Sequence, residues 1–84
     1  MEQKENKIAV IGIVVSNREE TAKKVNDILS DFGHIIVGRM GVPYREKEIS
    51  VISIIVDGTN DEIGALTGKL GNISGIKAKV ALTY

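Results

Sequence analysis

The sequence predicts an α+β fold in which two helices cover one face of a four-stranded antiparallel sheet. Strand-like and helix-like segments follow one another in the order strand, helix, strand, strand, helix, strand. Each helix-like segment begins with a capping pattern and ends near a glycine. Two of the strand-like segments are apolar on both faces, which is typical of strands in the centre of a sheet.

The first strand and the first helix are predicted from the opening third of the chain. Residues 7–15 (KIAVIGIVV) are β-branched and bounded by polar residues, which favours a strand. Residues 16–19 (SNRE) fit a capping box, in which Ser16 accepts a bond from a backbone amide and Glu19 reaches back. A helix over 18–32 follows, and Gly33 is predicted to end it in a left-handed conformation. Its apolar residues recur at intervals of three and four and are Ala22, Val25, Ile28, Leu29 and Phe32.

The middle of the chain predicts two strands and the connection between them. The strands are expected over 34–40 and 49–57, and Asp57-Gly58 is expected to form a turn. The connection, residues 41–48, contains the only proline of the chain.

The glycine-rich stretch VDGTNDEIGALTGKLG resembles a phosphate loop at first sight. A Walker-type loop needs four residues between its glycines and a Ser or Thr after its lysine, whereas Gly64 and Gly68 enclose three and Leu70 follows Lys69. The stretch instead predicts a second helix, because residues 59–62 (TNDE) form another capping box. The helix is expected to reach Lys69 or Leu70, with Gly64 and Gly68 allowing close approach to the sheet or to a neighbour. Its apolar stripe is Ile63, Leu66 and Leu70, and its stop signal is Gly71.

The last strand, residues 76–84, alternates between apolar residues and the polar set that includes Lys77 and Lys79, as an edge strand should. The resulting order is the ferredoxin-like βαββαβ plan, with spatial strand order 4-1-3-2. The central strands, 7–15 and 49–57, are apolar on both faces, while two helices can cover only one side. We therefore expect a homo-oligomer, a dimer or tetramer, assembled through the second face with Val51 and Ile55 as candidate interface residues. Ordinary β-propensity is the alternative, and the pattern leaves open which set of each strand meets the helices.

The length and composition of the chain limit the classes of function that it can have. With 84 residues the chain is expected to be a single domain, 1–84, with a polar tail over 1–6. The absence of cysteine excludes disulfides, thiolate metal sites and cysteine nucleophiles. Eleven basic and eleven acidic residues without a long block of one sign argue against nucleic acid, and no apolar run is long enough for a membrane span. We expect a soluble, cytoplasmic protein.

No set of residues predicts catalysis, a cofactor or a metal site, because the carboxylates fall on helix starts and outer faces and His34 is the only histidine. The remaining functional candidate is the connection around Gly41-Val42-Pro43. Its candidate ligand or partner contacts are Arg39, Tyr44, Arg45 and Lys47. A guanidinium suits a carboxylate or a phosphate; the alternative is that Arg39 and Arg45 pair with neighbouring glutamates or with another subunit.

The sequence also resembles a known family. Asn26 to Leu29 with Phe32-Gly33, and then residues 35–79, are very similar to the small ACT-like iron-only hydrogenase system regulators, fold relatives of the C-terminal domain of nickel-responsive regulators. The blocks VGRMGVPYRE and DEIGALTGKLG carry most of this resemblance. It implies a small regulatory or ligand-sensing module that oligomerises through its sheet.

Only some functional residues of the ACT domains and of the nickel-responsive regulators have counterparts in this sequence. ACT domains that bind amino acids usually have a glycine between the first strand and the first helix. Here that stretch is residues 16–20 and has no glycine, which argues against amino-acid binding. Asn17 and Arg18 are the candidate ligand or partner contacts of this stretch. These 84 residues leave no length for the DNA-binding segment of a nickel-responsive regulator, so regulation is expected to need a partner protein. The leading hypothesis is a non-enzymatic regulatory module that binds a small anion or a partner. A structural subunit without a ligand is the alternative, and an enzyme acting on an acyl or phosphoryl substrate is the third.

Overall fold

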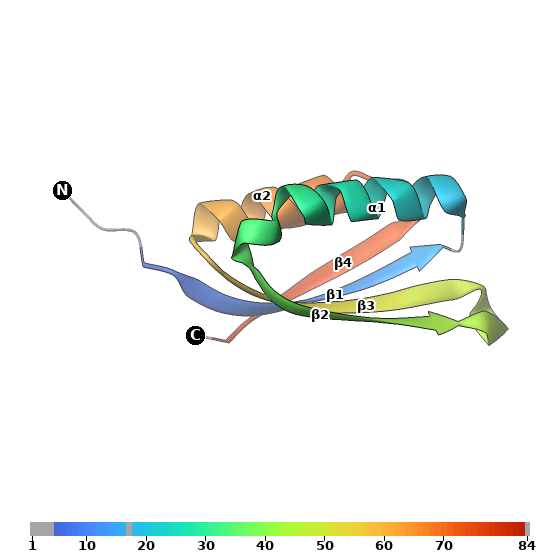
Figure 1. Ribbon diagram of the computed structural model, residues 1–84, viewed down its shortest axis with the longest axis horizontal. Coiled ribbons are helices and arrows are strands. Elements are labelled where there is room, and N and C mark those ends of the chain that lie inside the picture. The colour runs from blue at the N-terminus through green and yellow to red at the C-terminus, as the bar shows by residue number, and fades with distance from the viewer. Residues whose placement is uncertain (1–4, 17, 84) are drawn as a thin grey trace.

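The computed structural model describes residues 5–16 and 18–83. The elements follow the chain as β1 (Lys7–Ser16), α1 (Glu19–Asp31), the 3₁₀ turn η1 (Gly33–Ile35), β2 (Ile36–Tyr44), the 3₁₀ turn η2 (Arg45–Lys47), β3 (Ile49–Gly58), α2 (Asn60–Gly71) and β4 (Ile76–Leu82). Figure 1 shows α1 and α2 lying together on one face of the sheet, whose other face carries no helix of the described chain. This is the predicted ferredoxin-like arrangement.

The four strands pair in the order β2-β3-β1-β4, and every pair is antiparallel. The predicted order, with β1 and β3 in the centre, is therefore confirmed. β1 and β3 pair over their whole length, from Lys7 opposite Gly58 to Ser16 opposite Ile49. Residues opposite each other across a sheet share a face, so this register decides which side chains point together.

The core lies between the sheet and the helices. β1 turns Ala9, Ile11, Ile13 and Val15 toward the helices, and all of these side chains are buried. The other buried apolar residues of the core are Val25, Leu29, Ile35, Ile52, Ile54, Val56, Ile63, Leu66 and Leu70. Burial thus settles a point that the apolar pattern left open, namely which set of each central strand meets the helices.

Helix α1 begins differently from the prediction. Its N-cap is Arg18, whose side chain makes no capping hydrogen bond. Ser16 instead belongs to β1, where its backbone N–H donates to the carbonyl oxygen of Gly75 at 3.3 Å. The predicted capping box at residues 16–19 is therefore wrong, because the strand continues through Ser16 and the helix starts only at Glu19.

The predicted apolar stripe and end of α1 are partly correct. Val25 and Leu29 are buried, but Thr21 takes the place expected for Ala22, which is exposed. The expected left-handed Gly33 is wrong: the C-cap is Phe32 with φ −104°, and the chain continues into η1. Among the described glycines only Gly75 has a positive φ, at 88°.

Helix α2 begins with the predicted capping box, which is confirmed. The Glu62 N–H donates to Thr59 Oγ1 at 3.1 Å, and the Thr59 N–H donates to Glu62 Oε1 at 2.9 Å. The expected use of Gly64 and Gly68 against the sheet is wrong, since a Cβ at either position would meet nothing within 4 Å. Their approach to another protomer stays a prediction.

The connection predicted over 41–48 is largely strand. β2 runs to Tyr44 and includes Pro43, which is tolerated because β2 is an edge strand. The hairpin to β3 closes through η2 and Glu48, which has the left-handed φ of 56°. At its other end β2 begins at Ile36 instead of residue 34, and its register to β3 shifts between Ile36 and Gly38. No helix within the described ranges has the length and hydropathy of a membrane span.

Candidate functional site

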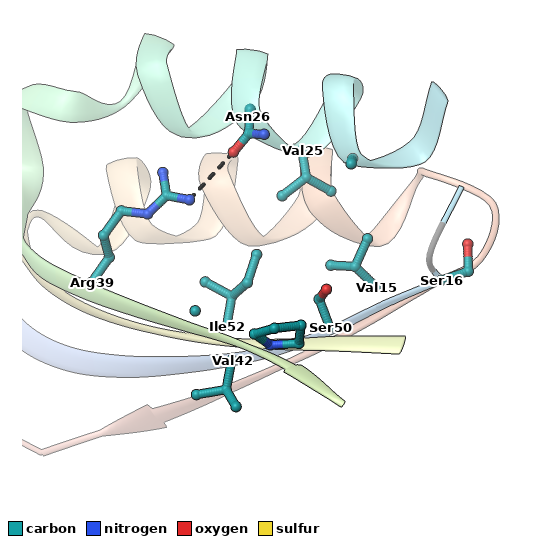
Figure 2. A pocket seen from close by; sticks show the side chains of 11 residues that line it. Val15, Ser16, Val25, Asn26, Arg39, Val42, Ser50 and Ile52 are labelled. Atoms are coloured by element: carbon teal, nitrogen blue, oxygen red, sulfur yellow. Dashed lines mark hydrogen bonds between the residues drawn. The ribbon is translucent and has the colours of Figure 1, made fainter. Parts of the chain in front are cut away.

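A groove lies between helix α1 and the neighbouring ends of the strands (Figure 2). Its volume is about 190 Å³. It is lined by Val15, Ser16, Ala22, Val25, Asn26, Arg39, Gly41, Val42, Pro43, Ser50 and Ile52. The groove opens where the second half of β2 diverges from α1. Its walls come from segments that lie far apart in the sequence.

Arg39 provides the positive charge of the groove. It lies opposite Ile54 in the β2-β3 register and so belongs to the helix-facing side of the edge strand. Its guanidinium reaches α1 and donates a hydrogen bond from Nη2 to Asn26 Oδ1 at 3.3 Å (Figure 2). The salt bridges found between described residues all involve other groups, so within this part of the chain no carboxylate neutralises Arg39.

The rest of the groove combines an apolar floor with two hydroxyls. Val15, Val25 and Ile52 are buried side chains of the core. Ser16 and Ser50 are half-buried and make no side-chain hydrogen bond to the described residues. The groove thus offers one cation, one amide and two hydroxyls above an apolar surface.

The other ligand contacts predicted from the sequence lie outside this groove. Arg18 is the exposed N-cap of α1, and Tyr44, Arg45 and Lys47 are exposed at the hairpin end of β2 and in η2. The predicted contact Asn17 falls outside the described residues. The four contacts predicted around the β2-β3 connection therefore do not form one cluster. Arg39 contacts Asn26 of α1, and the other three lie at the hairpin end.

Sequence reasoning missed three polar residues of the groove: Asn26, Ser16 and Ser50. Ser50 carried a usable signal, because it shares the strand face of Ile52 and Ile54 and is the polar member of that set. Asn26 carried none, since its contact with Arg39 depends on how α1 packs on the sheet. Ser16 was assigned to a helix cap, which concealed its place at the end of β1.

A second candidate site is the sheet face opposite the helices, here called the open face. Val51 and Ile55, the predicted interface residues, lie on it with 39% and 44% of their surface exposed. Val51 stands opposite both Val14 of β1 and Val42 of β2, so an apolar row crosses three strands. The other large exposed apolar side chains of this face are Ile8, Met40 and Tyr44.

The fourth strand gives the open face a basic border. Lys77 of β4 lies opposite Val14, and Lys79 lies opposite Gly12. Positive charge therefore lies along the β4 edge of the open face, a negative charge lies at its end where Asp57 stands opposite Ile8, and the row from Val42 to Val14 is apolar.

A third group of side chains lies at the start of α2. His34 Nε2 lies 3.2 Å from Glu62 Oε2, and the His34 ring stacks on Phe32 with their centroids 6.4 Å apart. The pKa of Glu62 is lowered, chiefly by the hydrogen bond from the Thr59 backbone N–H and secondarily by His34. Within residues 5–16 and 18–83, His, Asp and Glu side chains form no group of three that could hold a metal ion.

Comparison with known proteins places this fold in a family. The profile of the TM1266-like family, described as "Iron-only hydrogenase system regulator, putative", matches residues 7–80. The chain belongs to this family. It is also similar to the structure of the uncharacterized protein TM1266 from Thermotoga maritima, with a TM-score of 0.93 and 39% sequence identity, covering 95% of this chain and 100% of that one.

More distant structures share the fold alone. An unknown protein from Galdieria sulphuraria has a TM-score of 0.65 at 12% identity, covering 95% of this chain and 46% of that one. A formyltetrahydrofolate deformylase from Pseudomonas putida KT2440 has a TM-score of 0.62 at 10% identity, covering 88% of this chain and 28% of that one. A comparison with curated proteins gave no match.

Proposed function

We propose that the protein is a non-enzymatic regulatory module of the iron-only hydrogenase system that works as a homo-oligomer and binds a small ligand or a partner protein. Membership of the family supports the regulatory role. The observation that carries the proposal is the apolar row across the open face, from Val42 through Val51 to Val14. The occupant we assign to this face is a second copy of the same chain.

The energetics favour burial of the open face. Burying a fully exposed Val or Ile gains about 1.5 to 3 kcal/mol. Five Val and Ile side chains of the open face are 36 to 50% exposed, so each has about 0.5 to 1.5 kcal/mol still to gain; they are Ile8, Val14, Val42, Val51 and Ile55. These five side chains on each of two protomers would give about 5 to 15 kcal/mol. This gain is of the same size as the entropic cost of association, about 4 to 15 kcal/mol, so a dimer is within reach.

The shape and charge of the face favour a second copy over a different protein. An apolar row in the middle of a sheet can face its own copy across a two-fold axis, because both sides then present the same chemistry. Lys77 and Lys79 stay at the border, where solvent can reach them, so pairing need not bury them. A domain of 84 residues buries only roughly 60 to 70% of its unfolded surface alone, less than a larger domain does, so association would add stability.

Sedimentation velocity at micromolar concentration tests the proposal. We expect the unmodified protein to sediment as an oligomer and Val51→Lys to dissociate it, because two lysines would then be buried in the middle of the interface. Ser30→Lys is the matched control, since Ser30 is exposed on α1, away from the open face. Lys77 is unsuitable as a control site because it lies on the open face itself. A wild-type monomer without concentration dependence would overturn the proposal.

A further inference from the structure

We infer that the groove between α1 and β2 binds a small organic carboxylate that has an apolar tail and no ammonium group. The inference names the ligand class for the sensing role proposed above and rests on that role only for its biological purpose. Binding itself depends on the groove alone.

The charge of the groove selects an anion. Arg39 is held by a single neutral partner, the amide oxygen of Asn26 at 3.3 Å, and no carboxylate of the described chain neutralises it. A guanidinium presents its donors in a planar fork that matches the two oxygens of a carboxylate. Once Arg39 turns toward a ligand, the Asn26 amide is free to donate as well.

The apolar floor selects the tail of the ligand. Val15, Val25 and Ile52 lie between the Arg39 end of the groove and the Ser16 end (Figure 2). Pockets for drug-sized ligands measure about 300 to 1,000 Å³. At about 190 Å³ the groove has room for a short branched chain only.

Two observations exclude related ligand classes. Among the described residues that line the groove there is no Asp or Glu, so the ammonium group of an amino acid would lose its hydration without gaining a counter-ion from them. Inorganic phosphate would find a single cation and would leave the apolar floor of the groove without a contact.

Nuclear magnetic resonance titration of the ¹⁵N-labelled protein with 3-methylbutanoate tests the inference. We expect saturable shifts of the backbone amides of Asn26, Arg39 and Ser50. Three matched probes define the class: 3-methylbutylamine has the same skeleton with the opposite charge, leucine adds an ammonium group, and inorganic phosphate lacks the tail. Each should bind at least tenfold more weakly. Equal binding of any of the three, or no saturable shift with 3-methylbutanoate, would overturn the inference.

Variants locate the site. Arg39→Gln removes the cation, and Asn26→Asp places a carboxylate beside Arg39 that neutralises it internally; each should weaken binding of 3-methylbutanoate at least tenfold. Lys24→Gln, an exposed charge change on α1 outside the groove, should leave binding unchanged. Arg39 is exposed on an edge strand, so its substitution should leave the fold intact. A circular dichroism spectrum of each variant checks that it is folded. Unaltered binding by both groove variants would refute the assigned site.

The same samples separate this inference from the proposed oligomer. Sedimentation of Arg39→Gln should match that of the unmodified protein, because Arg39 lies on the helix-facing side of the sheet. An oligomer that binds no 3-methylbutanoate would overturn the ligand inference alone. A monomer that binds it would overturn the proposed assembly alone.

Discussion

Removing the hydroxyl that caps α2 should destabilise the protein by about 1 kcal/mol. In Thr59→Ala the Glu62 N–H loses its acceptor, Thr59 Oγ1 at 3.1 Å, while the reciprocal bond from the backbone N–H of residue 59 to Glu62 Oε1 is kept. Substituting such a cap by alanine costs about 0.5 to 2 kcal/mol. For a domain of 84 residues, a loss of 1 kcal/mol lowers the melting temperature by about 4 to 8 °C.

Ser16→Ala is the matched comparison, because the sequence predicts a capping box at both positions and the structure contains one. The Ser16 hydroxyl accepts no bond from the start of α1, whose cap is Arg18. We therefore expect Ser16→Ala to change the free energy of unfolding by less than about 0.5 kcal/mol, as substitutions away from special features do. Thr59→Ser keeps the hydroxyl and should restore most of the loss.

Urea unfolding followed by circular dichroism measures these differences. All variants must be compared at one protein concentration, since a protein that self-associates has a concentration-dependent stability. A loss in Ser16→Ala equal to that in Thr59→Ala would refute the assignment of the two helix starts. So would a Thr59→Ala protein as stable as the unmodified one.

Three further predictions follow from packing and charge. Leu66→Ala should lower the free energy of unfolding in urea by about 2 to 5 kcal/mol, because Leu66 is a fully buried residue of α2 and truncating its side chain leaves a cavity. Gly64→Ala and Gly68→Ala should each stabilise the protein by up to about 1 kcal/mol, since their sites are open and alanine favours the helix; a loss of stability would instead indicate that another protomer packs there. The lowered pKa of Glu62 means that its ionised form stabilises the fold above about pH 4.5, and this contribution is lost as the pH falls through the lower folded-state pKa. Unfolding measured between about pH 2 and 6 should therefore be less pH-dependent in Glu62→Gln than in the unmodified protein.

The strand order could be predicted because the central strands carry apolar residues on both of their faces. β1 and β3 have no polar face, and only central strands of such a sheet satisfy that pattern. The start of α2 was predictable for a local reason, since Thr59 and Glu62 make their bonds to each other.

Predictions failed where tertiary pairing outweighed a local preference. Ser16 carries a helix-start signal, but pairing with Ile49 keeps it in β1. Pro43 suggests a loop, but the outer edge of β2 needs no N–H donor there. The groove was predictable through Arg39 and Ser50 but not through Asn26, which is 13 residues from Arg39 in the chain and is brought close to it by helix packing alone.

The apolar character of both faces of β1 and β3 also affects how the chain folds. Sliding one of these strands by a single residue exchanges its two faces, and here both faces are apolar, so hydrophobicity alone distinguishes poorly between the native register and its neighbours. Residues 8–15 and 49–56 contain no charge and no proline, the composition of segments that stack into cross-β aggregates. We therefore expect docking of α1 and α2 onto the set that begins with Ala9 to select the register. In that case the helices complete the core and also limit misaligned pairing of the strands.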